Sequence, residues 1–121
     1  MADMNLRNYA YIGDAIWEVF IREKTIKITE NSKKLHKITT EKVKASFQAF
    51  LLQNLDEILT DEEKEIARRA RNLPIPLGRR LIQAESRQAT AFEVLIGYFH
   101  EHDKERLVFV ENYLEKFIEF E

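Results

Sequence analysis

The sequence predicts an all-α domain, a bundle of five to seven helices. Hydrophobic residues make up 45% of its 121 residues, which is enough to bury a core, and the chain holds only three glycines and two prolines. No stretch alternates apolar and polar residues over the length of a strand. Apolar residues instead recur at helical spacing, first at Ile12, Ala15, Ile16, Val19 and Phe20. We therefore expect one helical domain over residues 1–121.

The first half of the chain predicts three helices. The first apolar stripe indicates a helix over residues 5–23. The polar stretch 29–32 then offers N-cap residue types for a short second helix. Thr39 or Thr40 is the expected N-cap of the third helix, in which apolar residues again fall on one face.

A loop divides the helices of the second half. Thr60, with Glu63 three residues later, has the form of a capping box and predicts a helix over residues 61–71. Both prolines and one of the three glycines fall within residues 73–78, which we expect to be the main loop. The remaining helices are expected over about residues 79–100 and after an N-cap at Asp103.

Composition excludes several classes of site. The chain has no cysteine, so a disulfide framework, a thiolate zinc site and a cysteine nucleophile are all excluded. No apolar run is long enough to span a membrane, and the first nine residues have neither the basic flank nor the apolar stretch of a secretory signal. We expect a cytoplasmic protein with no membrane partner.

Charge alternates in blocks along the chain, although the net charge is only −2. Residues 24–48 carry seven lysines against two glutamates, and residues 68–87 carry six arginines against one glutamate. Acids predominate over residues 49–67 and 101–121. Basic blocks are a feature of nucleic-acid binding, but they are equally typical of solvated helix faces. The charge pattern alone leaves both interpretations open.

Two carboxylates lie in unusually apolar surroundings. Asp14 is the only charge in residues 9–17, and Glu93 is the only charge in residues 89–99. The second segment is apolar around most of a helix, so we expect it to be largely buried. An unpaired carboxylate in such a place costs several kcal/mol or becomes protonated. A cation would relieve both groups.

That cation is either a bound metal or an arginine. Without cysteine, oxygen ligands favour a hard ion, Mg²⁺ or Mn²⁺, and Mg²⁺ commonly takes one or two protein carboxylates together with water and substrate phosphate. The alternative is structural. Asp14 would then be an N-cap after a helix break at Gly13, and Glu93 would pair with an arginine of residues 68–87.

Both acids fall in motifs that resemble those of the ribonuclease III family. Residues 11–15, Tyr-Ile-Gly-Asp-Ala, resemble the first signature of that family, and residues 90–97, Thr-Ala-Phe-Glu-Val-Leu-Ile-Gly, resemble the second. Residues 35–37 and 68–72 look more narrowly like Mini-ribonuclease III, a short bacterial branch without the appended double-stranded-RNA-binding domain. The resemblance covers nearly the whole chain and implies the helical bundle of the ribonuclease III endonuclease domain.

The chain also departs from the family pattern. Larger members carry further acids at the positions of Arg7, Ala10 and Thr90, so only the two acids described above remain. Mini-ribonuclease III is similar in keeping just this pair. Ala70 stands where that branch usually has glycine, which bears on the turn that follows.

The resemblance implies an Mg²⁺-dependent endoribonuclease that hydrolyses phosphodiester bonds in double-stranded RNA and leaves 5′-phosphates. Asp14 and Glu93 would be the catalytic residues and the metal ligands, with Mn²⁺ as the substitute ion, and the Thr90 hydroxyl would orient a metal-bound water. The family likeness also implies a homodimer, in which Tyr11 contacts the partner subunit. RNA contacts are expected at Arg68, Arg69, Arg71, Asn72, Arg79, Arg80 and Arg87, with the lysines of residues 33–44 as a second candidate surface.

The branch suggests ribosomal RNA precursors, such as the 23S precursor, as the substrate, and a ribosomal protein that presents it. Two other readings stay open. One is a non-catalytic, dimeric helical protein of the same fold that binds RNA or associates with the ribosome. The reduced set of carboxylates is the reason to consider it. The other is a helical protein-interaction module without RNA, in which both acids are pairing partners.

Overall fold

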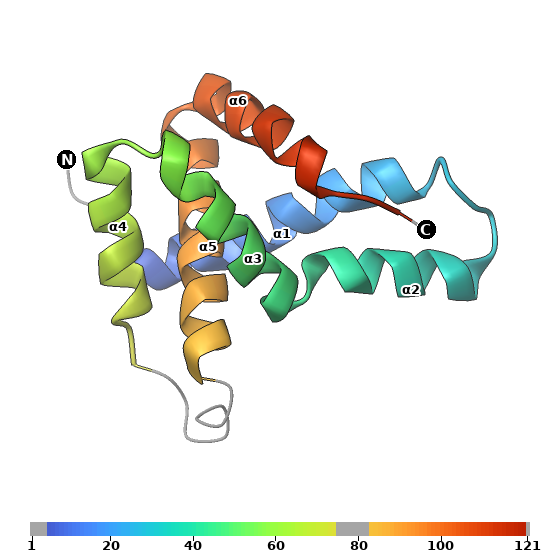
Figure 1. Cartoon of the computed structure of the whole chain (residues 1–121), viewed down its shortest axis with the longest axis horizontal. Helices are drawn as coiled ribbons and strands as arrows, with labels where there is room; N and C mark the ends of the chain where they lie inside the picture. Colours follow the sequence, from blue (N-terminus) through green and yellow to red (C-terminus); the bar gives the residue numbers. More distant parts are fainter. Residues whose placement is uncertain (1–4, 75–82, 121) are drawn as a thin grey trace.

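The computed structural model describes residues 5–74 and 83–120, and no strand occurs in that part of the chain. Its six α-helices form a bundle (Figure 1). Two single turns of 3₁₀ helix, Asp56–Ile58 and Glu115–Phe117, follow α3 and α6. The helices are α1 Leu6–Thr25, α2 Ser32–Val43, α3 Ala45–Leu55, α4 Asp61–Arg71, α5 Gln83–His102 and α6 Lys104–Leu114. The prediction of an all-α fold with five to seven helices is confirmed. None of the described helices combines the length and the apolar character needed to cross a membrane.

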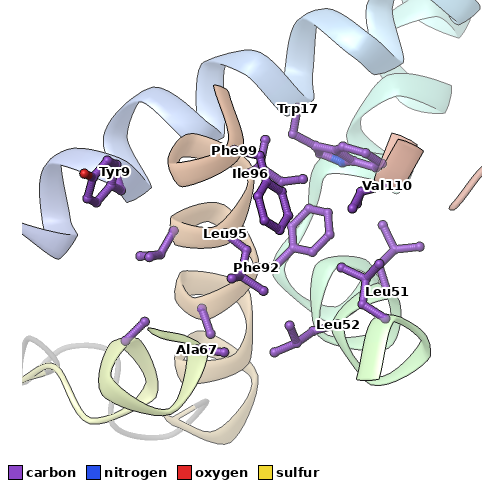
Figure 2. Packing of buried hydrophobic residues seen from close by; sticks show 14 of the residues in the cluster. Tyr9, Trp17, Leu51, Leu52, Ala67, Phe92, Leu95, Ile96, Phe99 and Val110 are labelled. Carbon is purple, nitrogen blue, oxygen red and sulfur yellow. The ribbon is translucent and has the colours of Figure 1, made fainter. Parts of the chain in front are cut away.

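The central helix of the bundle is α5, which packs against α1, α3, α4 and α6 (Figure 1). It is buried around most of its circumference, as its apolar sequence predicts. Its fully or almost fully buried apolar side chains are Ala91, Phe92, Val94, Leu95, Ile96 and Phe99. Side chains from α1, α3, α4 and α6 complete the core around this helix (Figure 2). The second acid motif therefore lies in the best-packed element of the fold.

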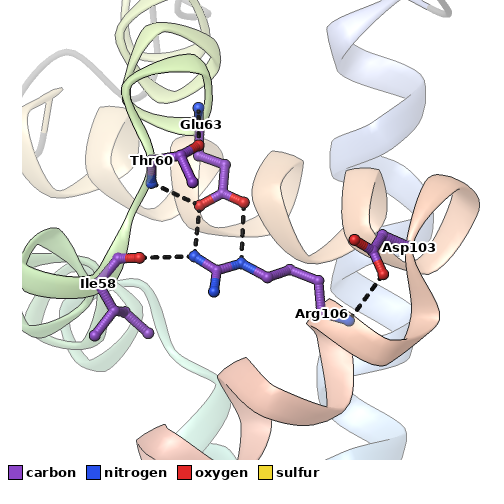
Figure 3. A network of polar contacts seen from close by, with 5 residues as sticks. All are labelled: Ile58, Thr60, Glu63, Asp103 and Arg106. Atoms are coloured by element: carbon purple, nitrogen blue, oxygen red, sulfur yellow. Dashed lines mark hydrogen bonds and ion pairs between the residues drawn. The ribbon is translucent and has the colours of Figure 1, made fainter.

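The start of α4 follows the expected capping box. The Thr60 hydroxyl accepts a hydrogen bond from the Glu63 backbone N–H at 3.1 Å, and the Glu63 carboxylate accepts one from the Thr60 N–H at 2.9 Å. The same carboxylate binds the Arg106 guanidinium of α6, which also donates to the Ile58 carbonyl at 2.7 Å (Figure 3). Asp103 caps α6 by accepting from the Arg106 N–H, as predicted. A local cap and a long-range ion pair thus share one carboxylate.

The predicted caps at Thr39 and Thr40 are wrong. Both residues lie inside α2, which begins after Asn31, whose side-chain oxygen accepts from the Lys34 N–H at 2.9 Å. The Thr39 hydroxyl is buried and forms a hydrogen bond with the Thr25 hydroxyl of α1 at 2.9 Å. A threonine that satisfies its hydroxyl in a helix–helix contact has no need to cap, and that contact is not visible in the local sequence.

Candidate active site

The two acid motifs meet where α1 crosses α5. A Cβ built on Gly13 would lie 1.8 Å from the Glu93 carbonyl oxygen, and a Cβ on Gly97 would lie 2.0 Å from the Tyr9 carbonyl oxygen. Real side chains do not tolerate such distances, so the two helices approach backbone to backbone at both points. Asp14 follows Gly13 directly. The crossing therefore brings the backbones of the two motifs together, at the residue before Asp14 and at Glu93 itself.

Asp14 lies within the uninterrupted helix Leu6–Thr25. The alternative interpretation of Asp14 as an N-cap after a helix break at Gly13 is therefore wrong. Gly13 is present in the helix because α5 occupies the place of its side chain, and not because the helix ends there. The cap of α1 is Asn5, whose side chain accepts from the Arg7 N–H at 2.8 Å.

The surroundings of the two acids differ more than the sequence suggests. Glu93 is half-buried between buried neighbours in α5, in agreement with the prediction for its segment. Asp14 is exposed, because the apolar residues next to it are divided between two faces of α1. Tyr9 and Trp17 point into the core, whereas Tyr11 is 85% exposed. The expectation that apolar surroundings make a cation favourable at both acids thus fails for Asp14, because an exposed carboxylate has no desolvation cost to relieve.

Two further contacts fix the crossing. The Trp17 ring packs edge-on against Phe92, with centroids 5.0 Å apart, and its Nε1 donates to the Lys42 carbonyl of α2 at 2.9 Å. The Tyr9 hydroxyl lies 2.6 Å from His102 Nε2 at the other end of α5. No local pattern predicts the Tyr9–His102 bond, because the two residues are 93 positions apart and meet only where the helices cross. Together they hold the helix segments on both sides of the acid pair.

Asp14 and Glu93 would offer oxygen ligands to a metal ion, but not a complete cage. In residues 5–74 and 83–120, no group of three or more His, Cys, Asp or Glu side chains could hold a metal ion. Two carboxylates fit the donor chemistry of Mg²⁺, which retains water and takes phosphate oxygens from a substrate. Thr90 is half-buried in α5, one turn before Glu93 on the same helix. Arg7, at a position where larger family members have an acid, donates to the Pro74 carbonyl at 2.6 Å.

The predicted RNA-binding residues that the structure describes lie at the end of α4 and at the start of α5, and their side chains differ in how far they are already bonded. Arg68 and Arg69 are exposed near the C-terminal end of the helix, and Arg68 is held by a two-pronged hydrogen bond to Glu65 at 2.7 and 2.8 Å. Arg87 of α5 donates to the Arg71 carbonyl at 2.6 Å and to the Leu73 carbonyl at 3.2 Å. It therefore ties the end of α4 to α5. Asn72, the C-cap of α4, is exposed, while Arg79 and Arg80 lie outside the described residues.

Tyr11 is the most exposed of the large apolar side chains that the structure describes. Ala15 and Val19 follow it at helical spacing on α1 and are exposed as well. Trp17 and Phe92, the aromatic residues of the helix crossing, are by contrast fully buried in the core. An apolar stripe at Tyr11, Ala15 and Val19 is thus open to solvent on the helix that carries Asp14.

Comparisons with known proteins agree with this geometry. The family model described as ribonuclease III domain matches residues 7–104, which contain both acid motifs. Mini-ribonuclease 3 of Gloeobacter violaceus is 41% identical over 104 residues, which cover 86% of this chain and 77% of that protein. Mini-ribonuclease 3 of a Synechococcus strain is 40% identical over 98 residues, which cover 81% and 71%.

A solved structure shows the same arrangement of the chain. The crystal structure of a protein from Fusobacterium nucleatum matches with a TM-score of 0.83 and 32% sequence identity, and the match covers 95% of this chain and 94% of that one. The resemblance that the two motifs indicate is therefore confirmed over the sequence and over the fold. The chain belongs to the ribonuclease III family of endoribonucleases.

Proposed function

We propose that the chain is an Mg²⁺-dependent endonuclease that hydrolyses phosphodiester bonds in double-stranded RNA and leaves a 5′-phosphate and a 3′-hydroxyl. The observation that carries this proposal is the contact of Gly13 with the Glu93 backbone. It joins the backbones of the two motifs, whose acids are 79 positions apart in the sequence, and so supports a site that both acids share. A mere pairing role for Asp14 is disfavoured because its side chain is exposed and no pairing is needed to offset burial.

In this proposal Asp14 and Glu93 hold the ion, Mg²⁺ or in its place Mn²⁺. When bound there, such an ion would supply two effects: a lower pKa of a bound water molecule and an offset to the charge that builds up on the phosphate. Neither carboxylate needs to act as a general base. The Thr90 hydroxyl orients the attacking water from one turn before Glu93, and we expect Thr90→Ala to lower the rate of cleavage and to alter its Mg²⁺ dependence. Full activity with unchanged Mg²⁺ dependence would remove Thr90 from the mechanism.

The duplex is recognised by its shape and its phosphates rather than by its bases. A-form RNA offers phosphates and 2′-hydroxyls across a shallow minor groove, and arginine can bind both. Arg69 is exposed at the end of α4, so its charge is accessible to the duplex. Arg68 is bonded to Glu65, so it can bind a phosphate only if it breaks or shares those hydrogen bonds. The proposed RNA surface also includes Arg71, Asn72, Arg79 and Arg80. Arg87 belongs to it chiefly by holding the end of α4 in place, because its guanidinium is bonded to two carbonyls there.

The exposed stripe at Tyr11, Ala15 and Val19 supports a two-fold dimer, in which each subunit cuts one strand. As substrate we propose a ribosomal RNA precursor, such as that of 23S RNA, presented with the help of a ribosomal protein. The oligomeric state is measured by light scattering at micromolar concentration. A wild-type monomer would contradict the dimer, and Tyr11→Asp should shift a dimer toward monomer.

The experiment that tests the proposed activity uses a labelled, blunt RNA duplex with Mg²⁺ and with a chelator. The wild-type protein should cut the duplex only with Mg²⁺, and Asp14→Asn and Glu93→Gln should each lose at least about 100-fold in rate, since each removes one of two protein ligands. Glu23→Gln, which removes another exposed carboxylate of α1, is the matched control and should cut normally.

One observation favours a second candidate function. Because no third acid joins the pair in the described part of the chain, a protein of this fold that binds RNA without cutting it is the alternative. Binding of the duplex without any cleavage, unaffected by Asp14→Asn, would support that alternative. Failure to bind the duplex at all would contradict both functions.

A further inference from the structure

A groove between α2 and the C-terminal segment lies apart from the acid pair and from the arginines of α4. It encloses about 660 Å³ and combines cationic and aromatic side chains. Its walls are formed by Lys34, Lys37, Ile38, Glu41 and Lys42 of α2 and by Phe117, Glu119 and Phe120 of the C-terminal segment. These lysines belong to the basic block of residues 24–48, for which the proposed active site gives no role.

The groove carries more positive than negative charge. Within the described residues, none of Lys34, Lys37 and Lys42 has a carboxylate at ion-pair distance. Glu41 is bound at 2.8 Å by Lys44, which does not line the groove. The hydrogen bond and the charge of Lys44 lower the pKa of Glu41, and the charges of Lys42 and Lys37 add to this effect. Lys44 thus offsets the charge of Glu41, which stays ionised. Glu119 adds a second negative charge to the lining, and the three lysines outnumber these two acids, which favours an anion.

The aromatic side chains give the groove a second property. Phe117 and Phe120 are half-buried and pack against the core, so their rings are held in place. The Lys42 ammonium lies 5.9 Å from the centre of the Phe120 ring, which places a cation and an aromatic ring at the same point of the groove. Sites for single-stranded nucleic acid combine these two features, because cations follow the phosphates and rings stack on unpaired bases.

The groove is also joined to the candidate active site. The Lys42 carbonyl accepts the hydrogen bond of Trp17, whose ring packs on Phe92, the residue before Glu93. One wall of the groove is therefore fixed to the crossing of α1 and α5 through a single buried side chain.

We infer that this groove binds an unpaired stretch of RNA that adjoins the duplex, with Lys34, Lys37 and Lys42 on its phosphates and Phe120 stacked on a base. The inference rests on the proposed function, because it takes the bound polymer to be the RNA that the active site cuts. Duplex RNA alone would not use the rings, since its bases are already stacked on one another.

The test measures the binding of a fluorescent ten-nucleotide oligouridylate by anisotropy, without divalent ions, at two salt concentrations. Lys37→Gln and Phe120→Ala should each weaken binding about three- to tenfold, and Lys37→Gln should also reduce its salt dependence. Phe120→Tyr keeps the ring and should retain binding, which separates stacking from a loss of packing in Phe120→Ala. Lys27→Gln removes an exposed lysine outside the groove and is the matched control, expected to bind normally.

Three results would overturn the inference: wild-type binding by both Lys37→Gln and Phe120→Ala, an equal loss in Lys27→Gln, or displacement of the RNA by a deca-glutamate peptide at equal concentration. The last would assign the groove to an acidic peptide. Cleavage of the blunt duplex by the wild-type protein, measured in parallel, tests the proposed function separately. If the duplex is cut but binding of the oligouridylate does not depend on the groove residues, only the inference about the groove is contradicted. If binding depends on the groove residues but the duplex is not cut, the groove is supported and the proposed enzymatic activity is contradicted.

Discussion

Two contacts of the bundle are made by different kinds of interaction: the crossing of α1 with α5, and the packing of α6 against the rest. At the crossing, Gly13 and Gly97 let two backbones touch and leave no room for a side chain. At α6, charged side chains span the contact, as Arg106 reaches Glu63 of α4 and Lys24 of α1 reaches Glu115 after α6. At Gly13 and Gly97 the first contact depends on shape, whereas the ion pairs of the second depend on charge and therefore on pH.

This difference bears on where the acids lie. The proposed catalytic pair would need its two groups held within a fraction of an ångström, and a backbone contact between two helices suits that requirement. The α6 contact has no such demand, since none of the proposed catalytic residues lies on α6. We therefore expect substitutions at the crossing to affect folding and cleavage together, and substitutions at α6 to affect folding alone.

The largest effect is expected for Gly13→Ala. Helix propensity alone would make this substitution stabilising by about 1 kcal/mol, because alanine is the better helix former. A Cβ 1.8 Å from the Glu93 carbonyl oxygen forces the helices apart instead, and we expect a loss of about 3 kcal/mol in the free energy of unfolding. Urea unfolding measures this loss, and cleavage should fall with it. Ala15→Gly, on the exposed side of α1, is the control and should cost only about 1 kcal/mol. A Gly13→Ala variant more stable than the wild type would contradict the described crossing.

The parts of the fold that could be predicted from the sequence are those with a local cause. The capping box at Thr60 and Glu63 and the cap at Asp103 depend on residues within one turn, and both are confirmed. The caps at Thr39 and Thr40 were mispredicted because the partner of the Thr39 hydroxyl, Thr25, comes from another helix. Local residue types indicate several possible N-caps, and tertiary contacts determine which of them begins a helix.

The site follows the same division. Asp14 and Glu93 stand out in the sequence because each is a lone charge in a motif, and the motifs name the family. The exposure of Asp14 could not be predicted, because an apolar neighbour such as Tyr11 turns outward once Tyr9 and Trp17 have taken the buried face. Likewise, only the packed structure shows that the Arg87 guanidinium donates hydrogen bonds to backbone carbonyls at the end of α4.

At the α6 contact, Arg106→Met is expected to cost about 2 kcal/mol. The substitution leaves the Glu63 carboxylate, which is only 11% exposed, without its guanidinium and the Ile58 carbonyl without its donor (Figure 3). Thermal or urea unfolding measures the loss, and the rate of cleavage of the folded variant should stay near that of the wild type. Arg22→Met removes the exposed pair with Glu18 and is the control, with an expected loss below about 0.5 kcal/mol. Equal losses in the two variants would show that the Arg106 pair is no stronger than a surface pair.

The smallest effect is expected at Glu111 of α6, and its sign depends on pH. Burial, together with the like charge of Glu23 and, to a smaller extent, of Glu115, raises the pKa of Glu111 to about 7, against the opposing charge of Lys24. A carboxyl whose pKa is higher in the folded state than its ordinary 4.5 favours folding fully below pH 4.5 and loses that contribution as the pH rises through 7.

Glu111→Gln removes this ionisation and should raise the stability at pH 8 by roughly 1 kcal/mol, once solvent screening of a half-exposed group is allowed for. At pH 4 the variant and the wild type should unfold at nearly the same urea concentration, because Glu111 is protonated in both states. Glu105→Gln, an exposed acid of the same helix, should show no such pH-dependent gain. A Glu111→Gln gain that is equal at pH 4 and pH 8 would mean that the α6 contact responds to packing and not to charge, so that the two regions would be held by the same kind of force.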